Sequence, residues 1–354
     1  MTYCLTKSLK EAAIVLARSL VPGKPHHAQW MITRRCNYRC RGCNVWQEQD
    51  QTELAVEDIK RGLDILRNLG IAEIVFSGGN PLLREDINEI LDYASRSFVT
   101  TVCDNGSMAA GKIEALRDMD FVAISIDSLN AAKNDYIKGV EGAWKKAVQA
   151  VEALHSEGIN VSVTPTISQL NLSEIVDITN HFSRKGIPLW YSLYSYDLAE
   201  DANQLFRIGK ANDELAIKDK QAMVNLCDSL IEMKKKNNRI LMTNKLLKTL
   251  RMFYLENKRT WNCRALQNFL VIDQLGRIAG CHSHNFTASV FDLPEIWDSK
   301  EFDSLRRIYS SCTGCTYLCY IFYSLHGSSL SLAKDQWKNA NLLLKKNNSK
   351  HQAS

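Results

Sequence analysis

The sequence predicts an α/β protein built on a parallel sheet that is open or rolled into a partial barrel. Strand-like and helix-like apolar patterns alternate along roughly the first 200 residues. Gly, Asn or Asp stands at several strand-to-helix joints, as in Ser77-Gly78-Gly79-Asn80 and Asp104-Asn105-Gly106. Consecutive strand–helix units need crossover connections, and these make neighbouring strands parallel.

Each expected element follows from its apolar period. The strands are expected at 28–33, 72–76, 98–103, 121–126, 160–166 and 188–194. The helices between them are expected at 56–69, 85–96, 109–118, 142–157 and 172–185. In such sheets, the side chains that perform chemistry gather at the carboxyl ends of the strands.

After residue 200 the pattern changes to two helices, at 212–236 and 242–257, and a hairpin from Phe269 to Ala279 with Gly276 at its turn. We therefore expect five segments. They are an amphipathic helix in 1–26, a core in 27–200, a helical connection in 201–258, a small α+β cysteine-rich extension in 259–325 and a polar tail in 326–354.

The composition indicates a globular cytoplasmic protein. The chain has 354 residues, is 45% hydrophobic and has a formal net charge of only +5, which does not favour nucleic-acid binding. No apolar run is long enough to span a membrane, and the N-terminus does not resemble a signal peptide. The basic helix expected at 5–20 packs on the outside of the domain or makes peripheral membrane contact.

The eleven cysteines gather in two places rather than spreading like a disulfide framework. The first cluster, Cys36-x-x-x-Cys40-x-x-Cys43, directly follows the first expected strand. Thiolates suit zinc or iron–sulfur clusters, but a zinc site normally closes with four ligands. Three thiolates leave one iron of a cubane open to a substrate or cofactor, which predicts a catalyst rather than an electron carrier.

The segment Cys36-Asn37-Tyr38-Arg39-Cys40-Arg41-Gly42-Cys43 resembles the signature loop of radical S-adenosylmethionine (SAM) enzymes. The resemblance implies a partial (β/α)6 TIM-like barrel and a 4Fe–4S cluster whose open iron chelates SAM. It also implies reductive cleavage of SAM to methionine and a 5′-deoxyadenosyl radical, with a flavodoxin or ferredoxin as electron donor. A small zinc knuckle is the alternative for this loop.

The resemblance also implies a SAM pocket, with two departures from the family pattern. Gly78-Gly79-Asn80 is similar to a glycine-glycine-glutamate motif that binds the amino group of SAM, with Asn80 where glutamate is usual. Gly42 stands where a bulky residue is common, and Trp46 is a candidate to cover the adenine instead. The other residues similar to pocket positions are Asn105, Ser125, Asp127 and Asn171.

The late cysteines resemble the auxiliary-cluster extensions called Twitch and SPASM. The preferred ligands of an auxiliary 4Fe–4S cluster are Cys263, Cys281, Cys312 and Cys315, with Cys319 as the leading substitute. Four such thiolates would also bind zinc, which remains the alternative metal. His282 and His284 flank Cys281 and are candidate partners of the ligands.

The sequence thus predicts a radical SAM enzyme that removes hydrogen from an unactivated C–H bond, giving oxidation, a cross-link or a new C–C or C–S bond. The substrate is a small molecule, a lipid or a peptide. A ribosomal-peptide maturase is one alternative, although residues 1–26 are short for a peptide-recognition domain. A catalytically degenerate protein that binds SAM or zinc is the alternative from another class, and Asn80 is its support.

Overall fold

A computed structural model describes residues 24–47, 52–195, 213–282, 288–312 and 316–326. The expected segments 1–26 and 326–354 lie almost wholly outside these residues, as do Cys315 and His284. Among the described helices, none is long and apolar enough to cross a bilayer.

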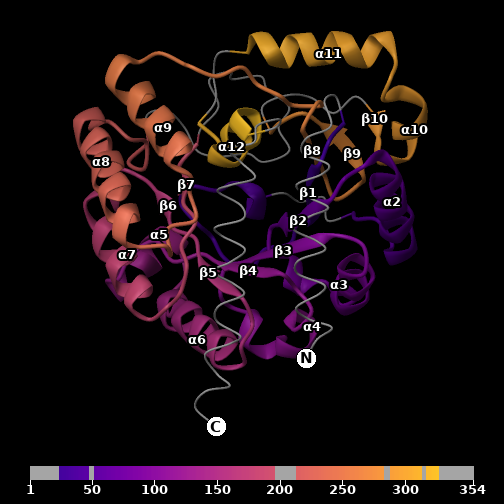
Figure 1. The fold of residues 1–354 in the computed structure, drawn as a ribbon. Helices are drawn as coiled ribbons and strands as arrows, with labels where there is room; N and C mark the ends of the chain where they lie inside the picture. The colour runs from indigo at the N-terminus through magenta and orange to yellow at the C-terminus, as the bar shows by residue number, and fades with distance from the viewer. Residues whose placement is uncertain (1–23, 48–51, 196–212, 283–287, 313–315, 327–354) are drawn as a thin grey trace.

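Within the described residues, the strands form one eight-stranded sheet and a separate pair (Figure 1). The large sheet has the order β10-β9-β8-β1-β2-β3-β4-β5, and the pair is β6-β7. The strands are β1 (His27–Thr33), β2 (Glu73–Gly78), β3 (Val99–Asp104), β4 (Phe121–Ile124), β5 (Val161–Val163), β6 (Thr166–Ile167), β7 (Ser192–Leu193), β8 (Phe269–Ile272), β9 (Arg277–Ala279) and β10 (Ala288–Ser289).

Helices alternate with the strands from β1 to β7, as the sequence predicts, with α5 as an additional helix before α6. They are α2 (Val56–Leu69), α3 (Ile87–Ser95), α4 (Ile113–Leu116), α5 (Ala131–Lys138), α6 (Ala143–Ser156), α7 (Ile175–Arg184), α8 (Lys220–Lys236), α9 (Asn244–Glu256), α10 (Leu293–Ile296), α11 (Lys300–Ser311) and α12 (Leu318–His326). Short 3-10 turns are η1 (Val45–Gln47), η2 (Pro81–Leu83), η3 (Ala109–Gly111), η4 (Leu172–Glu174) and η5 (Val290–Asp292).

The core strands run parallel and curve without closing, so the fold is a partial barrel. Strands β1 to β5 pair in parallel in chain order. The curve then continues through single parallel bridges from Val163 to Leu189 and from Leu189 to Ile240. The expected strand 160–166 breaks at Pro165, whose nitrogen has no hydrogen to donate to a neighbour.

The expected hairpin forms, and it extends the core sheet. β8 and β9 pair antiparallel, while β8 pairs in parallel with β1. The cysteine-rich region is therefore joined to the core by main-chain hydrogen bonds beside the strand that leads into Cys36.

The two faces of β1 contact different helices. Trp30 packs against α2, where a Cβ on Gly62 would lie 2.6 Å from the indole. His27, on the other face, stacks on Tyr323 of α12 with ring centroids 3.7 Å apart. α12 therefore covers the face of β1 opposite α2, in the centre of the view in Figure 1.

Candidate active site

All three early cysteines lie on the loop of residues 34–44 after β1, which we call the cluster loop. η1 closes it, and the N–H of Cys43 donates to the carbonyl of Cys40 at 3.2 Å. Burial raises the pKa of all three thiols, Cys36 included. The pKa of Cys40 rises to about 12 and that of Cys43 to about 11. The Cys36 thiol raises the pKa of both Cys40 and Cys43 further, and the Cys43 thiol also raises that of Cys40. The structure thus brings the three thiols together at the carboxyl end of β1.

The last turn of α5 holds this loop in place. The N–H of Arg39 donates to the carbonyl of Lys138 at 3.3 Å, and that of Arg41 to the carbonyl of Ile137 at 3.0 Å. These carbonyls belong to the helix end, where they lack partners within the helix. The cluster loop therefore supplies the hydrogen bonds that end α5.

Ser125 and Asp127 act on the loop through Lys138. The ammonium of Lys138 lies 2.8 Å from Asp127 Oδ2 and donates to Ser125 Oγ, and only 5% of Lys138 is exposed. It opposes the effect of burial on the pKa of both Cys40 and Cys43. Sequence reasoning missed Lys138, because a lysine at a helix end usually lies in solvent.

The paired glycines pack against the start of the cluster loop. The N–H of Gly79 donates to the carbonyl of Thr33 at 2.9 Å, and that of Asn80 to the carbonyl of Arg35 at 2.8 Å. A Cβ on Gly78 would lie 2.2 Å from the Thr33 oxygen, and one on Gly79 would lie 2.1 Å from the Arg35 oxygen. Only glycine fits at either position, so the motif fixes the entry to the loop.

Asn80 presents its amide nitrogen to a polar network. Its Oδ1 accepts from the N–H of Leu82 at 3.0 Å and so begins η2. Its Nδ2 lies within hydrogen-bonding distance of Asn37 Oδ1, Asn105 Oδ1 and Ser107 Oγ, at 3.2–3.5 Å. The amide oxygen, the atom of Asn80 that could accept from an amino group, is therefore used inside the protein.

Asp104, the last residue of β3, lies beside Asn80. Its Oδ2 accepts from the N–H groups of Gly106 and Ala109 at 2.8 and 3.2 Å. Its Oδ1 is buried without a hydrogen-bond partner among the described residues. Burial raises the pKa of this carboxyl group, against the effect of Asn80 beside it.

Asn171 lies deeper than the other expected pocket residues and is fully buried. Its Nδ2 donates to the carbonyls of Asp127 and Thr166, both at 2.9 Å, and its Oδ1 accepts from the N–H of Ser168 at 2.8 Å. These bonds to the backbone tie the end of β4 to β6. They indicate a positioning role for Asn171.

The space beside Gly42 is filled from another strand. A Cβ on Gly42 would lie 2.7 Å from Cε2 of Tyr194, which follows β7. Tyr194 is 4% exposed, and its hydroxyl donates to Asp213. An aromatic ring therefore lies where the sequence lacks a bulky residue, although it comes from about 150 residues further along the chain.

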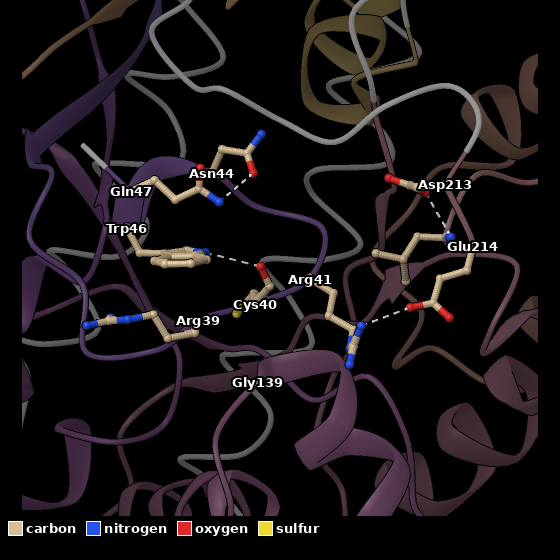
Figure 2. Close-up of a pocket in the computed structure, with 10 residues that line it drawn as sticks. Arg39, Cys40, Arg41, Asn44, Trp46, Gln47, Gly139, Asp213 and Glu214 are labelled. Carbon is tan, nitrogen blue, oxygen red and sulfur yellow. Dashed lines mark hydrogen bonds and ion pairs between the residues drawn. The ribbon is translucent and has the colours of Figure 1, made fainter. Parts of the chain in front are cut away.

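A pocket of about 430 Å³ opens beside the cluster loop (Figure 2). Trp46 donates from its indole nitrogen to the carbonyl of Cys40 at 3.3 Å, and the guanidinium of Arg39 lies 5.2 Å from its ring. Arg41 lies 3.7 Å from the ring of Tyr136 and pairs with Glu214 at 3.4 Å. The wall thus combines an indole, two guanidinium groups and acidic side chains next to Cys40.

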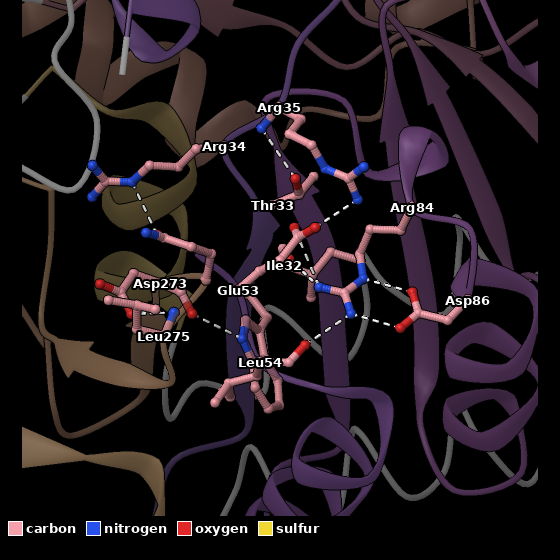
Figure 3. Close-up of polar contacts among 12 residues, drawn as sticks. Ile32, Thr33, Arg34, Arg35, Glu53, Leu54, Arg84, Asp86, Asp273 and Leu275 are labelled. Carbon is pink, nitrogen blue, oxygen red and sulfur yellow. Dashed lines mark hydrogen bonds and ion pairs between the residues drawn. The ribbon is translucent and has the colours of Figure 1, made fainter. Parts of the chain in front are cut away.

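Arg84 links the strand before the cluster loop to its neighbours (Figure 3). It is 3% exposed and donates to the carbonyls of Ile32 and Leu54, each at 2.9 Å. It also forms two bonds to Asp86, at 2.7 and 2.8 Å. Glu53 joins Arg84 to Arg35. Its Oε2 lies 3.4 Å from Arg84 Nη1, and its Oε1 lies 2.5 Å from Arg35 Nη2.

Three of the late cysteines gather around Tyr309. Burial raises the pKa of Tyr309, and the nearby thiols of Cys281, Cys263 and Cys312 raise it further. The Tyr309 hydroxyl accepts from the N–H of Gly280 at 2.9 Å. Cys263, Cys281 and Cys312 are therefore neighbours, while Cys315 lies outside the described residues.

Cys319 occupies a different place, on α12. Burial raises its pKa to about 12, and the thiol that raises it further is Cys103 of β3. His282 is 5% exposed and lies 2.5 Å from the hydroxyl of Tyr320. The Cys319 thiol therefore lies beside Cys103 rather than with the three thiols around Tyr309.

Among the described residues, no three His, Cys, Asp or Glu side chains converge closely enough to hold a single metal ion. A cubane makes a different demand on a protein. Each thiolate binds its own iron, so the sulfurs surround the cluster rather than meeting at one point.

Comparison with known proteins identifies a domain. Residues 30–182 match the model of the radical SAM superfamily, so this part of the chain is a radical SAM domain. A sequence relative, the AdoMet-dependent heme synthase of Oleidesulfovibrio alaskensis, is 28% identical over 187 residues, covering 51% of this chain and 48% of that protein. The chain spans about half the length of such curated relatives.

Solved structures share the fold at low sequence identity. SuiB of Streptococcus suis, bound to S-adenosylmethionine, has a TM-score of 0.65 at 16% identity, covering 82% of this chain and 70% of that one. anSMEcpe with bound AdoMet and the Cp18Cys peptide has a TM-score of 0.62 at 14% identity, covering 90% of this chain and 99% of that one. These likenesses establish the partial barrel.

The residues present fit the cofactors that this superfamily binds, a 4Fe–4S cluster and SAM. Three thiols stand on one loop, and an amide and hydroxyl network faces them from β2 and β3. The unpartnered Oδ1 of Asp104 leaves a buried acceptor beside that network. A donor-rich ligand would satisfy it.

Proposed function

We propose that this chain is a radical SAM enzyme that cleaves SAM at a cluster held by Cys36, Cys40 and Cys43. The observation that carries the proposal is the gathering of three thiols on a loop fixed by β1, by Gly78-Gly79 and by α5. A rigid loop serves a reaction in which a bound group must stay aligned with its substrate.

The reaction balances with one external electron. A 4Fe–4S cluster held by the three cysteines would supply radical chemistry: with that electron the C5′–S bond of bound SAM would break, giving methionine and an adenosyl radical able to take a hydrogen atom from the substrate. A flavodoxin or ferredoxin is the proposed donor and the cytoplasm the proposed compartment.

The residues of the site have separate tasks in this proposal. The three thiolates would hold three irons of the cluster and would leave the fourth open to SAM. Lys138, fixed by Asp127, places a positive charge beside Cys40 and Cys43 and so stabilises the thiolate form of both ligands. Asn80, Asn105 and Ser125 offer polar groups toward the polar end of SAM, while Trp46 and Tyr194 offer aromatic faces to the adenine.

An auxiliary 4Fe–4S cluster is the second part of the proposal. Cys263, Cys281 and Cys312 lie around Tyr309, and Cys315 is only three residues beyond Cys312. β8 joins this region to β1 by parallel pairing. An auxiliary cluster here would take up the electron that remains on the substrate after hydrogen abstraction.

The lining of the pocket beside Cys40 indicates a class of substrate. The pocket beside Cys40 carries Arg39 and Arg41 together with Asp213 and Glu214, which suits a substrate with both donors and acceptors. A polar small molecule or a peptide fits this lining better than a lipid does. A ribosomal-peptide maturase is the second candidate.

Anaerobic reconstitution tests the proposal. The purified protein is loaded with iron and sulfide, reduced with dithionite and given SAM. We expect 5′-deoxyadenosine from the wild type and none from Cys40→Ala. Iron binding without cleavage would instead identify a degenerate SAM-binding protein, and zinc in place of iron would refute the proposal.

A further inference from the structure

Asp104 lies where it can do what Asn80 cannot. Asn80 Oδ1 is hydrogen-bonded to the N–H of Leu82, and its Nδ2 faces the network of Asn37, Asn105 and Ser107. An amide nitrogen is a donor only, so it repels another donor such as an amino or ammonium group.

The Asp104 carboxylate is the neighbouring acceptor. It is 4% exposed, and its Oδ2 is used by Gly106 and Ala109. Its Oδ1 is buried without a hydrogen-bond partner among the described residues. A buried carboxylate oxygen without a partner costs free energy, so such an atom in a native protein calls for an explanation.

The surroundings of Asp104 place it beside the cluster loop. Its carboxylate raises the pKa of Cys36 and of Tyr38, whose hydroxyl is also buried without a partner among the described residues. Tyr38 lies in the cluster loop itself, and the Asn80 amide lowers the pKa of the same carboxyl group. The Asp104 carboxylate is therefore close to both Cys36, the first proposed ligand, and Asn80, where the sequence lacks a glutamate.

We propose that Asp104 Oδ1 accepts a hydrogen bond from the amino group of SAM and supplies the negative charge that Asn80 lacks. SAM carries one donor group at its polar end, the amino group, and one acceptor group, the carboxylate. Asp104 matches the first. The proposal rests on the proposed function, because it concerns the SAM that the cluster loop would bind.

The test measures SAM binding rather than turnover. Reconstituted wild type, Asp104→Asn and Asp104→Asn/Asn80→Glu are compared by anaerobic equilibrium dialysis, with iron content determined for each. Asp104→Asn keeps an oxygen to accept from Gly106 and Ala109 but loses the charge. We expect its SAM affinity to fall about 10-fold or more at unchanged iron content, because hydrogen bonds to charged groups are the strong ones. We expect the double variant to regain most of the affinity.

Two controls separate binding from folding. Asp120→Asn makes the same change at another Asp that caps a strand, where it accepts from the N–H of Thr100 at 2.8 Å. It should leave SAM affinity unchanged. A SAM analogue without the amino group should bind wild type and Asp104→Asn equally.

The outcomes distinguish the two proposals. If wild type binds iron and SAM but Asp104→Asn binds SAM equally well, the role of Asp104 is refuted while the proposed function stands. The same holds if Asp104→Asn weakens the analogue as much as SAM. If wild type itself binds no iron or no SAM, both proposals fail.

Discussion

At the scale of single residues, the site depends on positions where no other side chain fits. Gly79 is one, because the carbonyl of Arg35 occupies the space where a Cβ would be. Backbone cannot move away as the end of a flexible side chain can, so the cluster loop would have to shift.

We predict that Gly79→Ala lowers the iron content of the reconstituted protein by disturbing the entry to the cluster loop. Gly111→Ala is the matched control, because a Cβ there meets nothing within 4 Å. Iron and sulfide analysis of both variants decides the matter. Equal iron in the two would show that the loop tolerates the shift.

Arg84 is a second residue whose replacement should be costly. Arg84→Met leaves Asp86 and two carbonyls without their donor, and we expect it to lower the free energy of unfolding by about 3 kcal/mol. Arg96→Met removes an exposed ion pair to Asp92 and should cost less than about 1 kcal/mol. Denaturant unfolding compares them, and equal losses would contradict the role given to Arg84.

The ion pair between Arg84 and Asp86 predicts that the free energy of unfolding depends on pH. The hydrogen bond from Arg84 holds the pKa of Asp86 below its ordinary value of 3.8. The charged carboxylate therefore stabilises the folded state above that value, and this contribution is lost as the pH falls through the lower folded pKa. Asp86→Asn should flatten the acid limb of the stability curve, measured by unfolding between about pH 2 and 5. An unchanged acid limb would contradict this.

At the scale of elements, α12 joins the late cysteine region to the barrel. Tyr323 stacks on His27 and donates to Glu73 Oε2 at 2.8 Å, while Tyr320 stacks on Phe269 of β8 at 5.0 Å. Through these contacts α12 holds β1, β2 and β8 together on one face.

Tyr323→Phe should therefore destabilise the protein by about 1–3 kcal/mol, since Glu73 loses a donor in a buried setting while the ring stack remains. Tyr136→Phe, at a side chain 44% exposed, should cost much less. Thermal unfolding of the two variants measures the difference, and similar melting temperatures would argue against α12 as the joining element.

The sequence predicted the βα elements well, because their apolar period is regular. The helix expected at 56–69 is α2 with the same bounds, and the expected hairpin is β8–β9. It missed α12, whose segment Leu-Cys-Tyr-Ile-Phe-Tyr is rich in aromatic residues that favour strands, and which is helical because it is packed between other elements. It also missed the pairing of β8 with β1, because no local pattern encodes contact between segments 240 residues apart.

For the site, the sequence identified the chemistry but not the partners. The three cysteines are recognisable from their spacing, and the paired glycines from their resemblance to a family motif. Lys138, Tyr194 and Asp104 contribute through contacts made by the fold, so their roles could be read only from the structure. Cys319 illustrates the converse, since its spacing fits a ligand while its side chain neighbours Cys103.

At the scale of the whole molecule, the two proposed metal centres share one sheet. The loop after β1 would carry the first, and the region joined to β1 through β8 would carry the second. Wild type should bind about eight iron atoms per chain, the sum of two cubane clusters. Cys312→Ala should bind about four, whereas Cys319→Ala should bind about eight. Loss of iron in Cys319→Ala instead would make Cys319 the ligand.

The measurement that tests the central claim most directly is the amount of 5′-deoxyadenosine formed from SAM by the reduced, reconstituted protein. We expect the wild type to form it, Cys40→Ala to form none, and Cys227→Ala, a change at a buried cysteine of α8, to form as much as the wild type. A wild type that binds its full iron and SAM yet forms no 5′-deoxyadenosine would show that this chain does not cleave SAM.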